Sequence, residues 1–215
     1  MIIAIDGLGV NGKSTLAKRI ADKFGFKYFN TGAIYRCIAL KIINEKLNIE
    51  NIEEVIEYLK NITVDFINEK VILDGRDVTE KIRTEQISVK STKWATLIPI
   101  KQLVRKIQKD FLEKNDTVIE GRDICTRIAP NADVKFYLYS DFETRVNRLW
   151  NSNQKVSIDL IRKDLLIRDK LDIDGGNFIK PKNAIEIDTS QMSIEQVYNT
   201  MIEKINITVH KNKKL

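Results

Sequence analysis

Residues 7–15 read Gly7-Leu8-Gly9-Val10-Asn11-Gly12-Lys13-Ser14-Thr15 and decide the fold of this chain. They match the pattern G-x-x-x-x-G-K-[ST] of a phosphate-binding loop. The apolar run Met1–Ile5 precedes them and the amphipathic stretch Leu16–Ala21 follows, which is the strand–loop–helix context that such a loop requires. The alternative is a glycine-rich turn without a ligand, which the joint presence of loop, lysine and hydroxyl disfavours.

The residue types of this loop suit a nucleoside triphosphate. Gly7, Gly9 and Gly12 allow backbone conformations that aim several N–H groups inward, and the start of the following helix adds its positive end. Lys13 is expected to reach the β- and γ-phosphates, and the Ser14 hydroxyl to ligate Mg²⁺. We therefore assign ATP binding, with Mg²⁺ as its cofactor, to all nine residues of the loop.

Composition places the chain among ordinary globular proteins. Its 215 residues suit one domain or a domain with an insertion, and 43% are hydrophobic and 31% charged. The net charge is +6, but the lysines are interleaved with acids. This pattern favours a solvated surface over a nucleic-acid track, so no nucleic-acid partner is expected.

The few cysteines and histidines exclude several chemistries. Two cysteines, Cys37 and Cys125, make no disulfide framework. No signal peptide is recognisable, and the opening apolar run is too short to span a membrane, so a cytoplasmic location is expected. The one histidine is His210 near the C-terminus, which excludes Ser–His–Asp and Cys–His catalysis and a His/Cys metal cluster. Arginine, lysine, aspartate and bound Mg²⁺ must then carry the chemistry.

Short apolar runs alternate with helical stretches along most of the chain. Strands are predicted at Ile2–Ile5, Tyr28–Phe29, Val118–Ile119, Val134–Leu138 and Ala184–Ile187. Helices are predicted at Thr15–Lys23, Ala33–Leu47, Ile100–Leu112, Asp141–Asn151, Ile158–Lys170 and Ile194–Ile205, the last starting at the capping box Ser193–Gln196. This alternation predicts an α/β fold with a parallel sheet covered by helices on both faces.

The segment from about Thr63 to Arg83 breaks the alternation. Val64–Ile67 and Lys70–Leu73 are strand-like, Asn68 and Glu69 are expected to form the turn between them, and Asp74-Gly75 is a further turn signal. A small antiparallel insertion is therefore predicted, followed by a helix from roughly Ser88 into Leu112.

Polar motifs follow the predicted strands, where ligands bind in parallel sheets. Thr31 and Arg36 open a helix and could hold an anion, or could be a threonine cap with a surface arginine. Arg122 could clamp a phosphate while Asp123 accepts from an exocyclic amine, or the two could form an ordinary salt bridge at the strand end.

Two further pairs have the spacing of one helix face. Arg145 and Arg148 are three residues apart, and Arg168 and Asp172 are four apart and can pair. Without the phosphate-binding loop, such pairs are usually solvated salt bridges of low value.

Together these motifs resemble those of bacterial cytidylate kinases over nearly the whole chain. The resemblance rests on residues 7–15, Thr31–Arg36, Leu73–Thr79 with Ile82–Thr84, Gly121–Asp123, Arg145 and Arg148, Arg168–Asp169 with Asp172, and Asp188–Ser193. It implies a single domain with a P-loop NTPase-type core over about 1–60 and 95–205. To this core it adds an inserted monophosphate-binding subdomain over about 61–94, a short helical lid over about 145–175 and a basic tail over 207–215.

The resemblance also implies an activity, the transfer of the γ-phosphoryl group of ATP to CMP or dCMP, and we expect a monomer. It assigns catalytic charges to Lys13, Arg122, Arg145 and Arg148. It assigns CMP binding to Thr31, Tyr35, Arg36, Thr92, Lys101, Arg122, Asp123, Arg168 and Asp172. Of these, Arg36 and Arg122 would hold the phosphate, Thr92, Lys101 and Asp123 would face cytosine, and Arg168 and Asp172 would bind the pentose side.

The chain departs from the family pattern at several positions. Lys101 stands where the family has arginine and lacks the planar fork of a guanidinium. The family segment Arg-Asp-x-x-Asp-x-x-Arg ends here in Gly175, so one cation is missing, for which Lys170 or Lys180 is a candidate replacement. Leu149 replaces a frequent further arginine, Leu8 and Gly9 replace the common proline and serine, and Thr31 replaces a serine. Two alternatives therefore remain: a kinase of another small molecule, such as UMP, and a nucleotide-binding protein that has lost catalysis.

Overall fold

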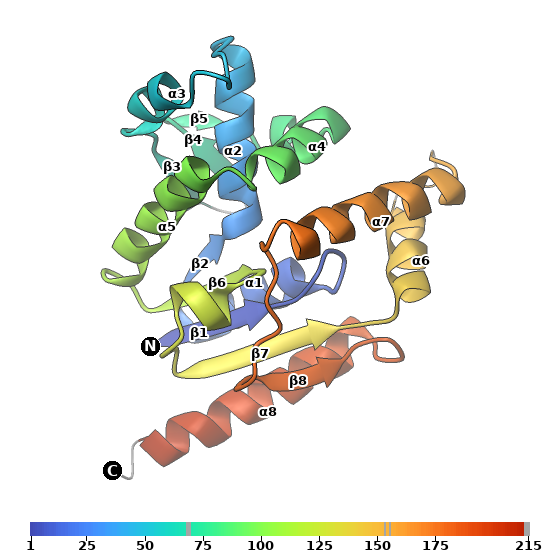
Figure 1. Ribbon diagram of the computed structural model, residues 1–215. Helices are drawn as coiled ribbons and strands as arrows, with labels where there is room; N and C mark the ends of the chain where they lie inside the picture. The colour runs from blue at the N-terminus through green and yellow to red at the C-terminus, as the bar shows by residue number, and fades with distance from the viewer. Residues whose placement is uncertain (68–69, 153, 155, 213–215) are drawn as a thin grey trace. The chain divides into compact units, whose positions relative to one another are not determined.

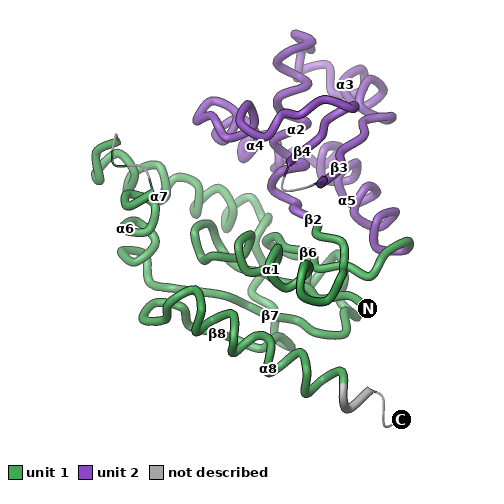
Figure 2. The backbone as a smooth tube through the Cα atoms, turned by 180° about the vertical axis from the view of Figure 1, so that it is seen from behind, with its two compact units in different colours: residues 1–29, 114–215 green, residues 30–113 purple. Residues whose placement is uncertain are grey.

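The computed structural model describes residues 1–67, 70–152, 154 and 156–212, and its backbone forms two compact units (Figure 2). Unit 1 comprises residues 1–29 and 114–215, and unit 2 comprises residues 30–113. The chain contains a five-stranded sheet and a separate three-stranded sheet. The division into core, insertion over 61–94 and lid over 145–175 stays a prediction.

The five-stranded sheet confirms the predicted strands. They are β1 (Ile2–Asp6), β2 (Lys27–Asn30), β6 (Thr117–Gly121), β7 (Val134–Tyr139) and β8 (Ile185–Asp188), in the order β2-β6-β1-β7-β8. β1 pairs in parallel with β6 and β7, so that Asp6 lies opposite Gly121 and Tyr137. The carboxyl ends of these strands therefore meet at one edge, from which the candidate loops depart.

Helices α1 (Lys13–Phe24) and α8 (Ile194–Asn212) cover one face of this sheet. Leu16 and Ile20 of α1 and Met201 of α8 join Ile3 and Ile5 of β1 in one buried cluster, and Figure 1 shows α8 running beside β8 and β7. Side chains alternate along a strand, so the Asp6 side chain points to the opposite face. There it meets the π-helical turn η2 (Ile124–Ile128).

Two further helices follow β7 in unit 1. They are α6 (Phe142–Ser152) and α7 (Ile158–Asp174). They pack through a small cluster of Val146, Ile161 and Leu165, and the Ser157 hydroxyl caps α7 by accepting from Leu160 N at 3.3 Å. α7 extends four residues beyond its predicted end at Lys170.

Unit 2 contains the antiparallel sheet and most of the remaining helices. Its elements are α2 (Thr31–Asn44), α3 (Ile52–Leu59), β3 (Val64–Ile67), β4 (Lys70–Leu73), β5 (Arg76–Asp77), the 3₁₀ turn η1 (Lys81–Arg83), α4 (Glu85–Trp94) and α5 (Ile98–Leu112). β4 pairs antiparallel with both β3 and β5, which confirms the predicted antiparallel segment. The expected turn residues Asn68 and Glu69 lie outside the described residues.

The prediction of one helix from Ser88 into Leu112 is wrong. The chain forms α4 and α5, separated by Ala95–Leu97, and Leu97 is extended with ψ 125°. Pro99 lies in the first turn of α5 and has no N–H to continue the helical hydrogen bonds back to Ala95. Helix α3 was not predicted, because it buries few residues, namely Val55 and Leu59.

Three other helix boundaries can be compared with their predicted positions. α2 ends at Asn44 rather than Leu47, because Lys46 takes the left-handed value φ 54°. The capping box before α8 is confirmed, since Ser193 N donates to Gln196 Oε1 and Gln196 N donates to Ser193 Oγ. α8 continues to Asn212, past its predicted end at Ile205.

Among the described helices, none has the length and apolar character needed to cross a membrane.

Candidate active site

The loop from Gly7 to Gly12 joins β1 to α1 and folds around its own lysine. Lys13 Nζ donates to the Leu8 carbonyl oxygen at 2.8 Å, and Asn11 Nδ2 donates to the same oxygen at 3.3 Å. Gly12 has φ 78° directly before the first helical residue, a conformation that glycine adopts without a steric penalty. The open N–H groups of the helix start therefore lie beside the lysine, as a phosphate site requires.

An unusual backbone conformation in this loop lies at Val10 instead of Gly9. Val10 has φ 67°, whereas Gly9 is not among the described glycines with positive φ. A β-branched residue rarely adopts this conformation, and packing of Val10 against the cluster of Val146 and Leu165 accompanies it. Gly7 is required for a different reason: a β-carbon there would lie 2.2 Å from the Leu138 carbonyl oxygen.

Lys13 is buried, which makes its charged form less stable than it is in water. Its residue exposure is 5%, and burial, followed by the positive charge of Arg122, lowers the pKa of Lys13 to about 8. A cation that is kept from water and lies near a second cation is stabilised when an anion arrives. The side chain that the motif singled out is therefore poised for an anionic ligand.

Ser14 lies next to Glu120, an acid to which no role was assigned from the sequence. Ser14 Oγ donates to Glu120 Oε1 at 2.7 Å, and the Tyr28 hydroxyl donates to the same oxygen at 3.3 Å. Among the described residues, no group of three or more His, Cys, Asp or Glu side chains could cage a metal. Mg²⁺ usually takes one or two protein oxygens together with waters and phosphates, so Ser14 and Glu120 fit it.

Two arginines converge on the loop at Gly9. A β-carbon at Gly9 would lie 3.7 Å from Arg122 Nη2 and 3.9 Å from Arg168 Nη2. Burial, and next the charge of Arg122, lowers the pKa of Arg168. Two guanidinium groups that repel each other beside a buried lysine make a strongly cationic surface, which is the electrostatic pattern of a phosphate site.

Asp172, which the sequence spacing allows to pair with Arg168, is hydrogen-bonded to Arg122. Arg122 Nε donates to Asp172 Oδ2 at 2.6 Å. Burial lowers the pKa of Arg122, but the charge and hydrogen bond of Asp172, together with the charges of Glu120 and Asp169, outweigh burial and raise the pKa overall. The negative charge of Asp172 also acts on Arg168, where it opposes the lowering of the pKa, so all three residues belong to the same cluster.

The two predicted arginines of α6, Arg145 and Arg148, bind different partners. Arg145 is buried and binds Asp169 in two parallel hydrogen bonds of 3.0 and 2.6 Å, and its Nη1 also reaches the Gly9 carbonyl oxygen at 3.4 Å. Arg145 Nε is a buried donor that lacks a partner among the described residues. Arg148 instead donates to the hydroxyl of Thr189 at 3.0 Å and to its carbonyl oxygen.

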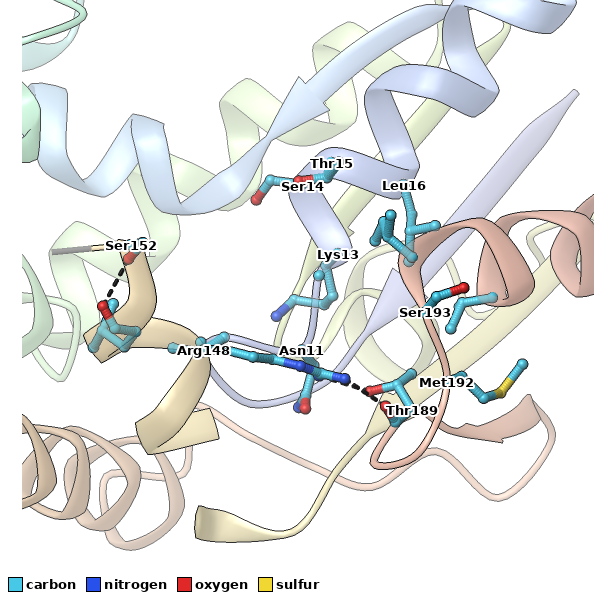
Figure 3. Close-up of a pocket in the computed structure, with 15 residues that line it drawn as sticks. Asn11, Lys13, Ser14, Thr15, Leu16, Arg148, Ser152, Thr189, Met192 and Ser193 are labelled. Carbon is cyan, nitrogen blue, oxygen red and sulfur yellow. Dashed lines mark hydrogen bonds between the residues drawn. The ribbon is translucent and has the colours of Figure 1, made fainter. Parts of the chain in front are cut away.

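A pocket of about 600 Å³ adjoins the loop in unit 1. The loop from Val10 to Leu16 lines one side, and Arg148, Thr189, Met192 and Val197 line others. In Figure 3 the hydrogen bond of Arg148 to Thr189 closes one edge of the pocket, while Met192 and Ser193 lie beyond Thr189. An apolar wall next to a phosphate loop is the arrangement that a nucleoside and its phosphates need.

Asp6, at the end of β1, was not predicted as part of the site. It is fully buried and accepts from Ile124 N at 2.9 Å and from Cys125 N at 2.8 Å. Burial raises the pKa of Asp6 to about 6, although both backbone bonds act to lower it. Asp6 thus fastens the turn that follows Arg122 and Asp123 to the strand that precedes the loop.

The other predicted CMP-binding residues belong to unit 2. Thr31, Tyr35 and Arg36 lie on α2, Thr92 on α4 and Lys101 on α5. The cap of α2 is Asn30, which accepts from Ala33 N at 2.8 Å, while the buried Thr31 hydroxyl accepts from Gln108 Nε2 at 2.9 Å. Arg122, Asp123, Arg168 and Asp172 belong to unit 1, so joint binding of CMP by all nine residues stays a prediction.

Sequence reasoning missed three acids of unit 1, namely Asp6, Glu120 and Asp169. Asp6 and Glu120 each stand near the carboxyl end of a buried strand next to the loop, and that position alone could have identified them. Asp169 was quoted only as a neighbour of Arg168. Its partner Arg145 comes from another helix, so no spacing in the sequence indicates the pair.

Comparison with known proteins places the chain in a family. A family model described as cytidylate kinase matches residues 3–207. Curated relatives named cytidylate kinase include one from Clostridioides difficile, 33% identical with 96% of this chain and 99% of the relative covered. One from Bacillus subtilis is 36% identical, with 94% and 95% covered, and one from Thermotoga maritima is 36% identical, with 94% and 96% covered.

Solved structures show a similar fold at low sequence identity. A shikimate kinase from Bacteroides thetaiotaomicron has a TM-score of 0.51 at 11% identity, with 98% of both chains covered. The protein TT1252 from Thermus thermophilus has a TM-score of 0.52 at 16% identity, with 96% of both chains covered. At these identities the likeness concerns the fold alone.

Proposed function

The chain belongs to the cytidylate kinase family, and from this premise we propose that it transfers the γ-phosphoryl group of ATP to CMP or dCMP. The products are ADP and CDP or dCDP, a step of pyrimidine nucleotide metabolism. The observation that carries the proposal is the cationic cluster around Gly9. Lys13, Arg122 and Arg168 surround the phosphate-binding loop, and Arg145 touches it at Gly9 O.

ATP is assigned to the pocket of about 600 Å³ beside the loop. Its phosphates would lie along the N–H groups of residues 7–15, with Lys13 exchanging its bond to Leu8 O for a phosphate oxygen. The base would lie toward Met192 and Val197 on the apolar side. Mg²⁺, held by Ser14 with Glu120 close by, would neutralise phosphate charge as it does in other phosphoryl-transfer enzymes.

The acceptor needs no general base from this chain. The attacking atom is a phosphate oxygen of CMP, which is largely ionised at neutral pH because the second pKa of a phosphate monoester is about 6. The arginines of unit 1 hold the acceptor phosphate and offset negative charge on the transferred group. Arg122, fixed by Asp172, and Arg145, whose Nε has no partner in the described part of the chain, are placed for these roles.

Catalysis then rests on position and on charge. The loop, the arginines and Lys13 bring two mutually repelling phosphate groups together and orient them in line. Exclusion of water from the closed site would prevent loss of the phosphoryl group to hydrolysis. We propose that α6 and α7 supply this cover, because Arg145 on α6 and Arg168 on α7 both reach the loop.

The remaining proposals concern the setting of the reaction. We expect a monomer in the cytoplasm, where ATP and Mg²⁺ are available. Cys37 and Cys125 are free and buried, which agrees with a reducing compartment.

A substrate panel tests the proposed function. ADP release is measured with Mg-ATP and CMP, dCMP, UMP or AMP as acceptor, and turnover is expected to be highest with CMP and dCMP. The Asp123→Ala variant should lose CMP binding far more than ATP binding, while Asp22→Ala, on the exposed side of α1, serves as the matched control. Highest turnover with UMP or with a non-nucleotide acceptor would assign another substrate, and ATP binding without any turnover would indicate a degenerate nucleotide-binding protein.

A further inference from the structure

Arg127 joins two segments of unit 1 that carry predicted acceptor-binding residues. Its Nη1 donates to the Gly176 carbonyl oxygen at 2.7 Å and to Asp123 Oδ2 at 3.3 Å. Asp123 is the expected reader of cytosine, and Gly176 follows α7, the helix of Arg168 and Asp172. Arg127 was not assigned any role from the sequence.

The turn that carries Arg127 is held at both ends. Arg127 N donates to Asp123 O at 2.8 Å, and Asp6 accepts from Ile124 N and Cys125 N between them. Asp123 and Arg127 are thereby fixed four residues apart on one turn, and the Asp123 side chain is only 18% exposed. The charge-assisted hydrogen bond from Arg127 then restrains the Asp123 carboxylate.

The segment after α7 turns back on the end of the helix through backbone hydrogen bonds. Asn177 N and Phe178 N both donate to Asp172 O at 2.8 Å, and Gly176 takes the left-handed value φ 62°. The Gly176 carbonyl accepts from Arg127. Arg127 therefore connects Asp123 to the same tight turn that closes on Asp172.

This connection stands where the sequence lacks a cation. The resemblance to the family predicts arginine at position 175, but Gly175 occupies it, one residue before the carbonyl that Arg127 binds. Lys180, a candidate replacement named from the sequence, pairs with Glu186 at 2.9 Å instead. Lys170 is exposed on α7.

We propose that Arg127 replaces the missing cation at position 175 and is a positioning residue for recognition of the acceptor base, acting through Asp123. The proposal rests on the proposed function and deepens it, because it names the contact that orients the base-reading carboxylate. Arg127 acts from the turn after β6 instead of from the end of α7. It orders the Asp123 carboxylate for the exocyclic amine of cytosine and restrains the turn next to Asp172.

The first test separates acceptor recognition from general damage. In Arg127→Ala we expect KM for CMP to rise about tenfold, the worth of one charge-assisted hydrogen bond, with KM for ATP changed less than twofold. The preference for CMP over UMP should fall by a similar factor, and Arg127→Lys, which keeps charge but not the fork, should be intermediate. Arg162→Ala, an exposed arginine of α7 paired with Glu143 and Asp159, is the matched control and should change none of these values.

Two double variants test whether Arg127 acts through Asp123 and replaces the cation missing at position 175. In an Asp123→Ala background, adding Arg127→Ala should cost less than a further twofold in CMP binding measured by calorimetry, because the carboxylate it orients is already gone. Gly175→Arg should restore at least half of the lost CMP preference to Arg127→Ala, since Gly175 has the helical value φ −72° that arginine adopts freely.

The outcomes distinguish this proposal from the proposed function. Absence of CMP turnover and of CMP binding in the unmodified protein overturns both. If the unmodified protein turns over CMP normally, three results overturn the role of Arg127 alone. These are equal rises in KM for ATP and CMP in Arg127→Ala, no change in KM or CMP preference in Arg127→Ala, and additive losses of CMP binding in the double variant with Asp123→Ala. A fall in thermal stability with an unchanged CMP preference also overturns it, because a merely structural contact predicts that result.

Discussion

Arg122 and Asp172 are fifty residues apart in the sequence and are joined by a hydrogen bond of 2.6 Å from Nε to Oδ2. The bond uses only the Nε side of the guanidinium, and Nη2 remains directed at Gly9 of the phosphate-binding loop. Asp172 therefore holds Arg122 with its Nη2 toward the loop. Arg145 is held in the opposite way, since its two terminal nitrogens bind Asp169 while Nε has no hydrogen-bond partner among the described residues.

The first prediction concerns this Arg122–Asp172 pair. Asp172→Asn keeps the shape of the side chain but removes the charge that orients Arg122, which is 27% exposed. We expect a loss of about 1–2 kcal/mol in the free energy of unfolding and a rise in KM for CMP of about tenfold. Denaturant titration and steady-state kinetics measure the two effects. Asp174→Asn, exposed at the end of the same helix, is the control, and equal behaviour of the two variants would contradict the pairing.

The second prediction concerns Lys13. Lys13→Ala should lower kcat by at least about 10²-fold, because it removes a buried charge next to the transferred group. Lys23→Ala, at the exposed end of the same helix, should leave kcat unchanged within twofold. In the unmodified protein kcat/KM for ATP should also decline above about pH 8, since the pKa of Lys13 is lowered to about 8 and the free enzyme then loses this charge. A Lys13→Ala variant with near-normal turnover would remove Lys13 from the mechanism.

The third prediction concerns the close approach of the loop to β7. Gly7→Ala places a β-carbon 2.2 Å from the Leu138 carbonyl oxygen, at φ 153°, so strand or loop must shift. We expect a loss of about 2–4 kcal/mol in the free energy of unfolding. Gly25→Ala has φ 69° but no atom within 4 Å, and should lose only about 1–2 kcal/mol from the left-handed backbone. Thermal unfolding of both variants compares them, and a smaller loss for Gly7→Ala would contradict the contact.

The fourth prediction concerns the pH dependence of stability. The pKa of Asp6 is raised from 3.8 to about 6 by burial, so between these values the native state binds more protons than the unfolded state. Its contribution to stability therefore falls as pH rises from about 4 to 6, by roughly 3 kcal/mol in all. The Asn side chain of Asp6→Asn does not titrate. The free energy of unfolding of this variant, relative to that of the unmodified protein, should therefore rise by roughly 3 kcal/mol between pH 4 and 7. Urea titrations at both pH values measure the difference, and a pH-independent difference would show that Asp6 does not titrate in this range.

Local sequence was sufficient for the parts of the fold that depend on neighbouring residues. The five strands were predicted because each contains a short apolar run, and the start of α8 because Ser193 and Gln196 cap each other. The break between α4 and α5 was missed although Pro99 was visible, because the helical pattern on both sides outweighed it. The end of α2 could not be predicted, since Lys46 gives no sequence signal for its left-handed conformation.

The sequence by itself determined the chemistry: a phosphate-binding loop with Lys13 and Ser14, a supply of arginines and acids, and no histidine placed for catalysis. It determined this because the loop motif is contiguous, so its geometry follows from local backbone preferences. Only the tertiary structure decided which distant acceptor each arginine binds: Arg122 binds the Asp172 carboxylate, Arg145 binds the Asp169 carboxylate, and Arg127 binds the Gly176 carbonyl oxygen. A guanidinium at the end of a flexible side chain pairs with whichever acceptor the packing of distant elements brings within reach, and no spacing along the chain encodes that choice.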